Sequence, residues 1–204
     1  VGNAPYTYYV YQQLYDNDGK PIQNAFVDRD GNGTINDNDR YMAVTADGKA
    51  IKPAPDFFYG ITFKATWKNW DFGFNGHGSV GNWLFNDAYA SHSTTNANIN
   101  YNYIANYSRS VLRSGFHSSN ITAQSFSDMF LENASFFRMD DINLGYTFKW
   151  RSQKSTIRIA LSAQNVFVLT KYSGLDPEAS GENGIDSSMW PRPRVYSLRA
   201  AINF

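Results

Sequence analysis

The chain has 204 residues, and its 18 Lys and Arg balance its 18 Asp and Glu, so the formal net charge at pH 7 is zero. A balanced charge argues against a nucleic-acid partner, which requires an excess of basic side chains. The chain has no cysteine, which excludes disulfide scaffolds and thiol chemistry, and no run of about 18 apolar residues, which excludes a transmembrane helix. No signal peptide opens it, so we expect a mature fragment or one piece of a longer polypeptide.

The first predicted strand lies near residues 5–13, within the sequence VGNAPYTYYVYQQ. A long connection over residues 14–56 follows, and it contains the stretch DRDGNGTINDND, residues 28–39. Asp or Asn stands at positions 1, 3, 5, 9 and 12 of this stretch, and Gly33 at position 6 permits a sharp turn.

That spacing is typical of a calcium-binding loop, because alternate side chains of a tight loop converge on one point and calcium takes about 6–8 oxygen ligands. Asp39 stands where a glutamate is usual, which indicates a weaker site or a dockerin-like variant of the loop. Asp, Asn and Gly also cluster in turns that bind no metal, and that alternative stays open at this point. We predict a structural Ca²⁺ that holds the long loop in place, with these ligands: the side chains of Asp28, Asp30, Asn32, Asn36 and Asp39, and the carbonyl of Thr34.

Strands are predicted over residues 57–67 and 70–80, because apolar and polar residues alternate along both segments. A two-residue turn at Lys68-Asn69 would place Trp67 and Trp70 opposite each other on the same face. The apolar faces of the two strands then merge without a shift in register, which supports a tight hairpin.

The same alternation predicts three further strands, near residues 137–150, 156–168 and 194–204. One face of each is continuously apolar. The other face carries charged, amide and small side chains, so it faces water. Residues expected on the polar faces include Lys64, Lys149, Arg158 and Arg199.

Two environments fit such strands. A soluble sandwich would bury the apolar faces in a shared core, whereas a membrane barrel would expose them to lipid and enclose water. Short turns on one side and long loops on the other favour the barrel. The short turns lie at residues 68–69 and 151–156, and the long connections near 14–56, 81–136 and 169–193. Trp67, Trp70 and Trp150 gather at the short-turn end, as an interfacial girdle does.

About six strands are too few for a closed bacterial barrel, which has at least about 8. We therefore predict an all-β fold, in which the chain is the C-terminal part of a larger antiparallel transmembrane β-barrel. If the last strand ends in the periplasm, both short turns are periplasmic and all three long loops are extracellular.

No residues indicate catalysis. Asp140 and Asp141 are adjacent, and neighbours in a strand point to opposite faces, so we expect that they do not form an acid–base pair. His77, His92 and His117 lack the spacing of metal ligands. Nucleotide loops and nucleophile elbows are also missing from the sequence. We predict that the chain is not an enzyme.

Six segments occur in an order that resembles one known family: VDRDGNGTINDNDR, KPAPDFFYGITFKATWKNWDFGF, GSVGNWLFND, LENASFFRMDDINLGYTF, SAQNVFVLTKYSGLDPE and PRPRVYSLRAAINF. Over nearly its whole length the chain resembles the C-terminal part of the SusC/RagA-type TonB-dependent outer-membrane transporters. Members of that family have an N-terminal plug and a barrel of about 22 strands. The resemblance implies that residues 1–204 are one barrel segment and that the plug is absent from this chain.

The resemblance further implies the outer membrane of a Gram-negative bacterium and the import of a glycan oligosaccharide or a peptide. A SusD-like surface lipoprotein would deliver the substrate, and TonB would supply energy through the missing N-terminal part. The remaining barrel, the plug and the lipid bilayer would complete the assembly. Substrate or lipoprotein contacts would be expected in two loops, Tyr172–Glu178 and residues 98–107, whose Tyr and Asn residues more often support loop packing. The alternative function is a soluble, calcium-stabilised carbohydrate-binding β-domain with exposed aromatic residues that stack on sugars.

Overall fold

A computed structural model describes residues 4–95, 106–117, 124, 126–150, 155–178, 181, 183–187 and 190–203. The chain divides into two compact units, which we call the sheet unit and the loop unit. The sheet unit contains Pro55–Gly81, Ser135–Lys171 and Trp190–Phe204. The loop unit contains Val1–Ala54, Asn82–Ala134 and Tyr172–Met189.

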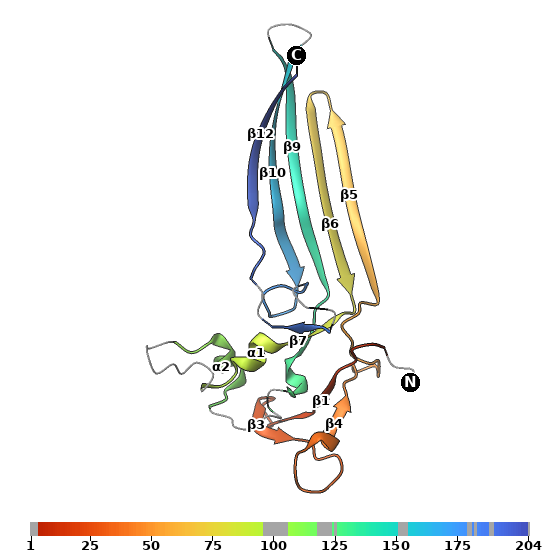
Figure 1. Cartoon of the computed structure of the whole chain (residues 1–204), viewed down its shortest axis with the longest axis vertical. Coiled ribbons are helices and arrows are strands. Elements are labelled where there is room, and N and C mark those ends of the chain that lie inside the picture. The colour runs from red at the N-terminus through yellow and green to blue at the C-terminus, as the bar shows by residue number, and fades with distance from the viewer. Residues whose placement is uncertain are drawn as a thin grey trace. The chain divides into compact units, whose positions relative to one another are not determined.

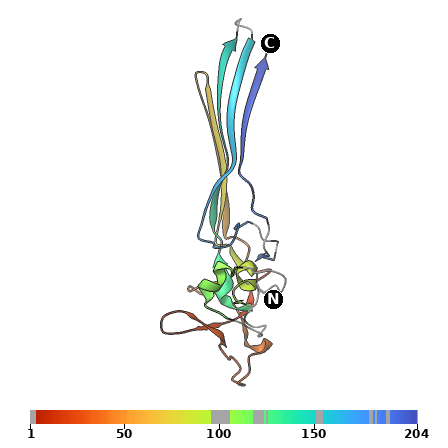
Figure 2. The same cartoon turned by 90° about the vertical axis from the view of Figure 1, so that its left-hand side faces the viewer.

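Five long strands run side by side in the sheet unit, as both views show (Figures 1 and 2). They are β5 (Phe57–Trp67), β6 (Trp70–Val80), β9 (Phe136–Trp150), β10 (Ser155–Thr170) and β12 (Val195–Asn203). Their order is β12-β10-β9-β6-β5, and every neighbouring pair is antiparallel. The bounds agree with the five strands predicted after residue 56, so those predictions are confirmed.

The hairpin between β5 and β6 turns at Lys68-Asn69, as the alternation predicts. Trp67 pairs with Trp70 across the turn. Lys68 has a φ of 55°, the left-handed conformation that two-residue hairpin turns need. The carbonyl of Asn69 accepts a hydrogen bond from the backbone N–H of Thr147 at 2.9 Å, which ties the turn to β9.

An irregularity interrupts the sheet at Asp140. On β6, Asn75 pairs with Asp141 while the next residue, Gly76, pairs with Met139, so Asp140 is an extra residue on β9. The register between β9 and β10 shifts at the same level. This β-bulge changes the side-chain alternation of β9, because an extra residue shifts all later side chains to the opposite face.

The loop unit contains shorter elements. Strand β1 (Tyr9–Tyr11) pairs with β4 (Arg40–Met42), β2 (Gln13–Tyr15) pairs with β3 (Pro21–Phe26), and β7 (Trp83–Asn86) lies between β8 (Leu131–Asn133) and β11 (Ile185–Asp186). Its helical elements are α1 (Asp87–Ser91), α2 (Arg109–Ser114) and the 3₁₀ turns η1 (Asp37–Asp39) and η4 (Asp128–Phe130). None of the helices among these residues is both long and apolar enough to cross a membrane.

The prediction of a sixth long strand near residues 5–13 is wrong. This segment forms β1 and the start of β2, and neither belongs to the large sheet, which therefore has five described strands and not about six. Val10 is buried in a cluster with Phe85 and Phe130, two residues that are distant in the sequence. Burial in this separate core, and not period-two alternation, determines where the segment lies.

Candidate functional site

The polar face of the sheet carries an ion pair that spans three strands. Arg158 of β10 donates two hydrogen bonds to the Asp71 carboxylate of β6, at 2.9 Å from Nε and 2.5 Å from Nη2. Gly145 of β9 lies beneath the pair, and a Cβ at this position would collide with both side chains. A Cβ at position 145 would therefore displace the ends of these two side chains from the positions in which they meet across β9.

Further along the same face, the bulge brings two carboxylates together with neighbouring polar side chains. Asn75 Nδ2 donates to Asp141 Oδ2 at 2.5 Å, and His77 Nδ1 lies 2.7 Å from Asp140 Oδ2. Asn75 and His77 are two residues apart on β6 and so share a face. The prediction that Asp140 and Asp141 point to opposite faces is wrong, because the extra residue turns both side chains to the polar side.

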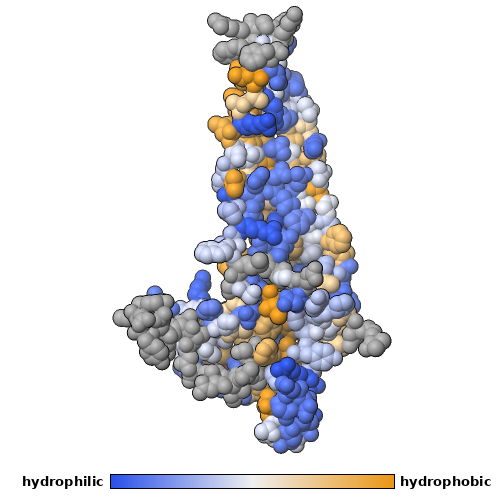
Figure 3. Space-filling model, in the orientation of Figure 1, coloured by the Kyte–Doolittle hydropathy of each residue, from blue (hydrophilic) through white to orange (hydrophobic). Residues whose placement is uncertain are grey.

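The opposite face of the sheet is apolar and exposed. One residue from each strand shows this, with exposed fractions of 46% for Ile61, 37% for Phe72, 41% for Leu144, 43% for Ile159 and 72% for Leu198. These side chains do not converge on a dry interior within the described residues. Figure 3 shows hydrophilic residues over the middle of the sheet on the side turned to the viewer, with hydrophobic residues at its margins.

Aromatic rings gather on the apolar face near the β5–β6 turn. Trp67 is 66% exposed, and the rings of Trp70 and Tyr146 meet edge to face at a centroid distance of 4.7 Å. The side chain of Trp150, predicted to join them, lies outside the described residues. Farther along, the rings of Tyr59 and Phe137 lie parallel, 6.3 Å apart.

In the loop unit, residues 28–39 bring three of the six predicted calcium ligands together. One carboxylate oxygen from each of Asp28, Asp30 and Asp39 lies within 4.8 Å of the others. Asp39 is fully buried. Its carboxylate accepts hydrogen bonds from the backbone N–H groups of Asn36 and Arg29, at 2.8 and 2.7 Å, and these donors lower its pKa.

The other three predicted ligands are engaged in local hydrogen bonds. Asn32 Oδ1 accepts from the backbone N–H of Thr34 at 2.7 Å. The carbonyl of Thr34 accepts from Asn36 Nδ2 at 3.1 Å, and Asn36 Oδ1 caps η1 by accepting from the N–H of Asn38. The donor set consists of oxygen atoms, the ligand type that calcium prefers, so its chemistry fits the predicted ion.

Substrate contacts were expected in two loops, Tyr172–Glu178 and residues 98–107. Tyr172 is buried, and its hydroxyl donates to Asp186 Oδ2 at 2.6 Å; burial and this bond raise the pKa of the phenol. It therefore supports packing. Of residues 98–107, only 106 and 107 are described, and Tyr107 is exposed.

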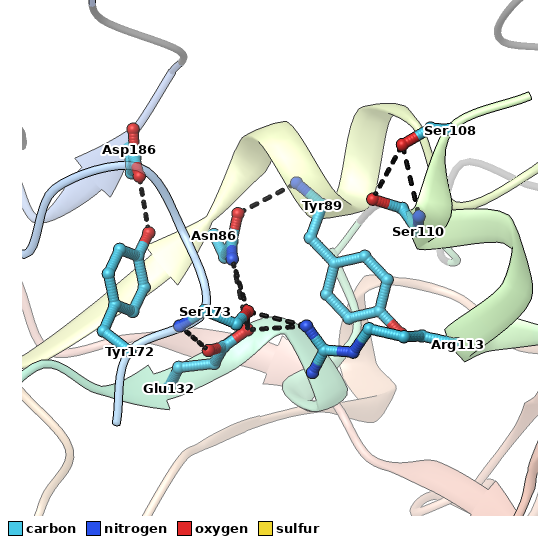
Figure 4. A network of polar contacts seen from close by, with 9 residues as sticks. All are labelled: Asn86, Tyr89, Ser108, Ser110, Arg113, Glu132, Tyr172, Ser173 and Asp186. Atoms are coloured by element: carbon cyan, nitrogen blue, oxygen red, sulfur yellow. Dashed lines mark hydrogen bonds and ion pairs between the residues drawn. The ribbon is translucent and has the colours of Figure 1, made fainter. Parts of the chain in front are cut away.

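A cavity of about 340 Å³ opens beside α1 and α2 of the loop unit. Arg113 of α2 extends across the ring of Tyr89, with its guanidinium carbon 4.4 Å from the ring centroid. Its Nη1 donates to Ser173 Oγ at 2.6 Å (Figure 4). The lining residues are Asn86, Ala88, Tyr89, His92, Ser108, Ser110, Arg113, Ser173, Gly174 and Leu175.

Sequence reasoning missed this cavity. Arg113 and Ser173 are 60 residues apart in the chain. Ser173 lies in the loop Tyr172–Glu178 that was expected to contact substrate, whereas Arg113 belongs to no motif. The only local sequence feature near the cavity is Ser108, which precedes α2. Its hydroxyl caps the helix by accepting a hydrogen bond from the N–H of Ser110. Nothing in that signal indicates which distant residue would face the helix.

Comparison with known proteins identifies the family, although no family model matches the chain. Over 211 aligned residues the chain is 38% identical to the TonB-dependent receptor SusC of Bacteroides thetaiotaomicron, a match that covers 100% of this chain and 20% of that protein. The chain belongs to the SusC-like TonB-dependent receptors. This SusC-like chain is also 26% identical over 202 residues to the TonB-dependent receptor P3 of Formosa agariphila, covering 92% of the chain and 19% of P3. It spans about a fifth of the length of these relatives.

Solved structures agree on the fold. The SusC-like chain matches a structure of the RagAB peptide transporter with a TM-score of 0.62 and 21% identity, over 96% of this chain and 22% of that one. It matches the RagAB peptide importer in its open-open state with a TM-score of 0.61 and 19% identity, over 97% and 22% of the two chains. The fold class is thus confirmed as a partial piece of a larger barrel. TonB-dependent receptors are not enzymes, in agreement with the sequence prediction.

Proposed function

We propose that the SusC-like chain forms part of the wall of an outer-membrane barrel that imports oligosaccharides or peptides. One observation carries the proposal: the five-stranded sheet has an exposed apolar face and an opposite face with ion pairs and amides. Transmembrane barrels need both faces, because lipid contacts one side and water the other.

The distribution of charge along the strands supports this orientation. Asp71 and Arg158 of the polar face pair with each other, and so do Asn75 and Asp141. A charged side chain on the lipid side would cost about 2–4 kcal/mol near the middle of the bilayer, whereas side chains on the water side are free to be polar. The pairs therefore suit a face that borders an aqueous lumen.

The partners of the proposed importer follow from its relatives. RagAB is described as a peptide importer, and SusC as a TonB-dependent receptor. A SusD-like surface lipoprotein would deliver the substrate, TonB would supply energy, and the plug and remaining strands would come from the rest of the receptor. The membrane would be the outer membrane of a Gram-negative bacterium.

The alternative, a soluble carbohydrate-binding β-domain, needs the apolar faces to share a core. Ile61, Leu144 and Leu198 are instead exposed, and β5 and β12 are the two edges of the sheet within the described residues. Unpaired edges of this length favour association with further strands. Both features favour a wall segment over a self-contained soluble domain.

Uptake by living cells tests the import function. Cells with the full-length receptor would be given fluorescent oligosaccharides and peptides, in the presence and absence of TonB. Uptake that requires both the receptor and TonB would support the proposal. Equal uptake by cells that lack the receptor gene, for every oligosaccharide and peptide, would contradict it.

For residues 28–39 we propose a bound Ca²⁺ with a structural role. Asp28, Asp30 and Asp39 would hold the ion, and the ion would offset the repulsion among their carboxylates. The clustering of these oxygens within 4.8 Å supports the proposal. The extracellular loop position expected for this segment would expose it to calcium concentrations that fill weak sites, with Kd about 10⁻⁴–10⁻³ M.

A further inference from the structure

The cavity beside α1 and α2 offers hydrogen-bond donors that the protein itself leaves unused. Arg113 donates from Nη1 to Ser173, while its Nε and Nη2 have no hydrogen-bond acceptor among the described residues. Ser110 Oγ accepts from Ser108 at 3.1 Å, and its own hydroxyl hydrogen likewise has no acceptor there. Both groups line the cavity.

The cavity also offers an acceptor. His92 Nδ1 lies 2.9 Å from the carbonyl oxygen of Ala88. A carbonyl can only accept, so Nδ1 carries the hydrogen, and in this tautomer Nε2 is the acceptor of the ring. Donors and an acceptor therefore line the same cavity, a combination that matches hydroxyl groups, which both donate and accept.

The charge of Arg113 is locally balanced. Glu132 Oε1 lies 3.9 Å from Arg113 Nη1, and the Glu132 carboxylate is mostly buried. Glu132 also accepts from Asn86 Nδ2 and from the N–H and hydroxyl of Ser173, so it is held in place (Figure 4). An anionic ligand would therefore gain little from the guanidinium, and a neutral polar ligand is favoured.

The local backbone disfavours a peptide. Peptides are commonly recognised by adding a strand to a free sheet edge. Strand β7, which contributes Asn86 to the cavity, is paired on both sides, with β11 and β8. Leu175, which is 57% exposed, adds an apolar surface that suits the C–H face of a sugar ring.

We propose that this cavity binds a terminal portion of a neutral oligosaccharide. Arg113 and Ser110 donate to its hydroxyls, His92 accepts from one, and Leu175 contacts a ring face. The volume of about 340 Å³ falls at the small end of ligand pockets, roughly 300–1,000 Å³. The inference rests on the proposed import function and narrows its substrate from glycans or peptides to neutral glycans.

Calorimetry on the purified full-length receptor with its lipoprotein partner tests the inference. The probes are hexasaccharides of glucose, mannose and xylose, and, separately, decapeptides. Arg113→Gln should weaken binding of a recognised hexasaccharide by roughly tenfold to a hundredfold, because hydrogen bonds from a charged donor contribute more than neutral ones. The control is Arg109→Gln, which changes an exposed arginine of the same helix that does not line the cavity and should leave affinity unchanged.

Ser110→Ala is the second variant, since it removes a hydroxyl without disturbing the Glu132 contact. This variant should lower the affinity for the same hexasaccharide by roughly threefold or more, as expected for the loss of one neutral hydrogen bond. Unchanged affinity in both variants, no binding of any hexasaccharide to the wild type, or peptide binding that depends on Arg113 would overturn the inference. Failure of the import proposal is distinguishable, because cells would then show no receptor-dependent uptake even though the purified receptor binds sugar.

Discussion

The sheet unit and the loop unit place their apolar side chains in opposite ways. In the sheet unit, Leu144 and Ile159 lie on long regular strands and remain exposed. In the loop unit, Phe130 is fully buried with Tyr8 and Phe85, residues that come from three separate parts of the chain. The sheet unit therefore needs apolar surroundings such as lipid, whereas the loop unit has a core of its own.

Deleting the central ring of the loop unit should produce the largest effect. Phe130 contacts Phe85 and Tyr89 edge to face, at centroid distances of 6.0 and 5.0 Å. Phe130→Ala should destabilise the loop unit by about 3–5 kcal/mol through lost burial and an internal cavity. Hydrogen exchange of the full-length receptor should show faster exchange in β7 and β8 and unchanged exchange in β9. Leu112→Ala, at an 84% exposed position, is the control and should change neither; equal effects of the two variants would contradict the proposed core.

Placing a charge on the apolar face should break the sheet unit. Leu144→Arg should cost about 2–4 kcal/mol if the side chain lies near the middle of the bilayer. The neighbouring substitution Asn143→Arg, on the polar face, should cost much less. Unfolding of the full-length receptor in lipid vesicles by guanidinium measures both. Equal costs at the two positions would mean that the faces do not differ in surroundings.

Calcium should stabilise the loop unit and leave the sheet unit unchanged. With Kd about 10⁻⁴–10⁻³ M, 10 mM calcium would add roughly 1.4–2.7 kcal/mol of stability. Hydrogen exchange of residues 28–39 should slow on calcium addition in the wild type and not in Asp30→Ser. Asp18→Asn, in another exposed turn, should respond like the wild type. If calcium leaves the exchange rates of residues 28–39 unchanged in the wild type, the loop binds no calcium.

Filling the space under the ion pair should have a smaller effect. Gly145→Ala would place a Cβ against Asp71 and Arg158 and separate them. The loss should be roughly 1 kcal/mol, because both side chains are about one-third exposed and the pair is screened by water. Gly60→Ala is the matched control, since a Cβ there meets only a carbonyl oxygen at 3.9 Å. Thermal unfolding that does not distinguish the two variants would argue against a role for the pair.

The pH dependence of residues 28–39 should be the smallest effect. Backbone hydrogen bonds from Asn36 and Arg29 lower the pKa of Asp39. Because the pKa is lower in the folded loop, this contribution is present above the ordinary aspartate value of about 3.9 and is lost as pH falls through the lowered pKa. Exchange in this loop, corrected for its intrinsic pH dependence, should be steady from pH 7 to 5 and rise below about pH 4. Asp39→Asn should remove that rise; a variant profile that matches the wild type would contradict this role.

The sequence predicts the sheet unit well because period-two alternation is a local signal. Strands β5 and β6 have the predicted bounds, and their turn lies at the predicted residues. The sequence of β9 also contains an indication of the bulge that the strand prediction did not use. After Phe136, the apolar residues of β9 stand first at odd positions, Phe137 and Met139, and then at even positions from Ile142 onward. A parity change within one strand indicates an extra residue between the two runs.

The loop unit is less predictable because its contacts join distant segments. Val10 and Phe85 lie in one buried cluster, and Arg113 donates a hydrogen bond to Ser173 beside the cavity. No periodicity links such pairs. Residues 28–39 are the exception, since Asp28, Asp30 and Asp39 lie within twelve residues and their spacing alone indicated that the carboxylates would converge.

The central claim is that one face of the sheet contacts lipid and the other borders water. Nitroxide labels placed one at a time on β9 of the full-length receptor in vesicles would test it directly, through collisions with oxygen, which concentrates in lipid, and with a water-soluble nickel complex. Labels at Ile142, Leu144 and Tyr146 should collide with oxygen, and labels at Asn143 and Thr147 with nickel. Low collision rates with both reagents at Ile142, Leu144 and Tyr146 would place those side chains in a dry protein interior and contradict the account.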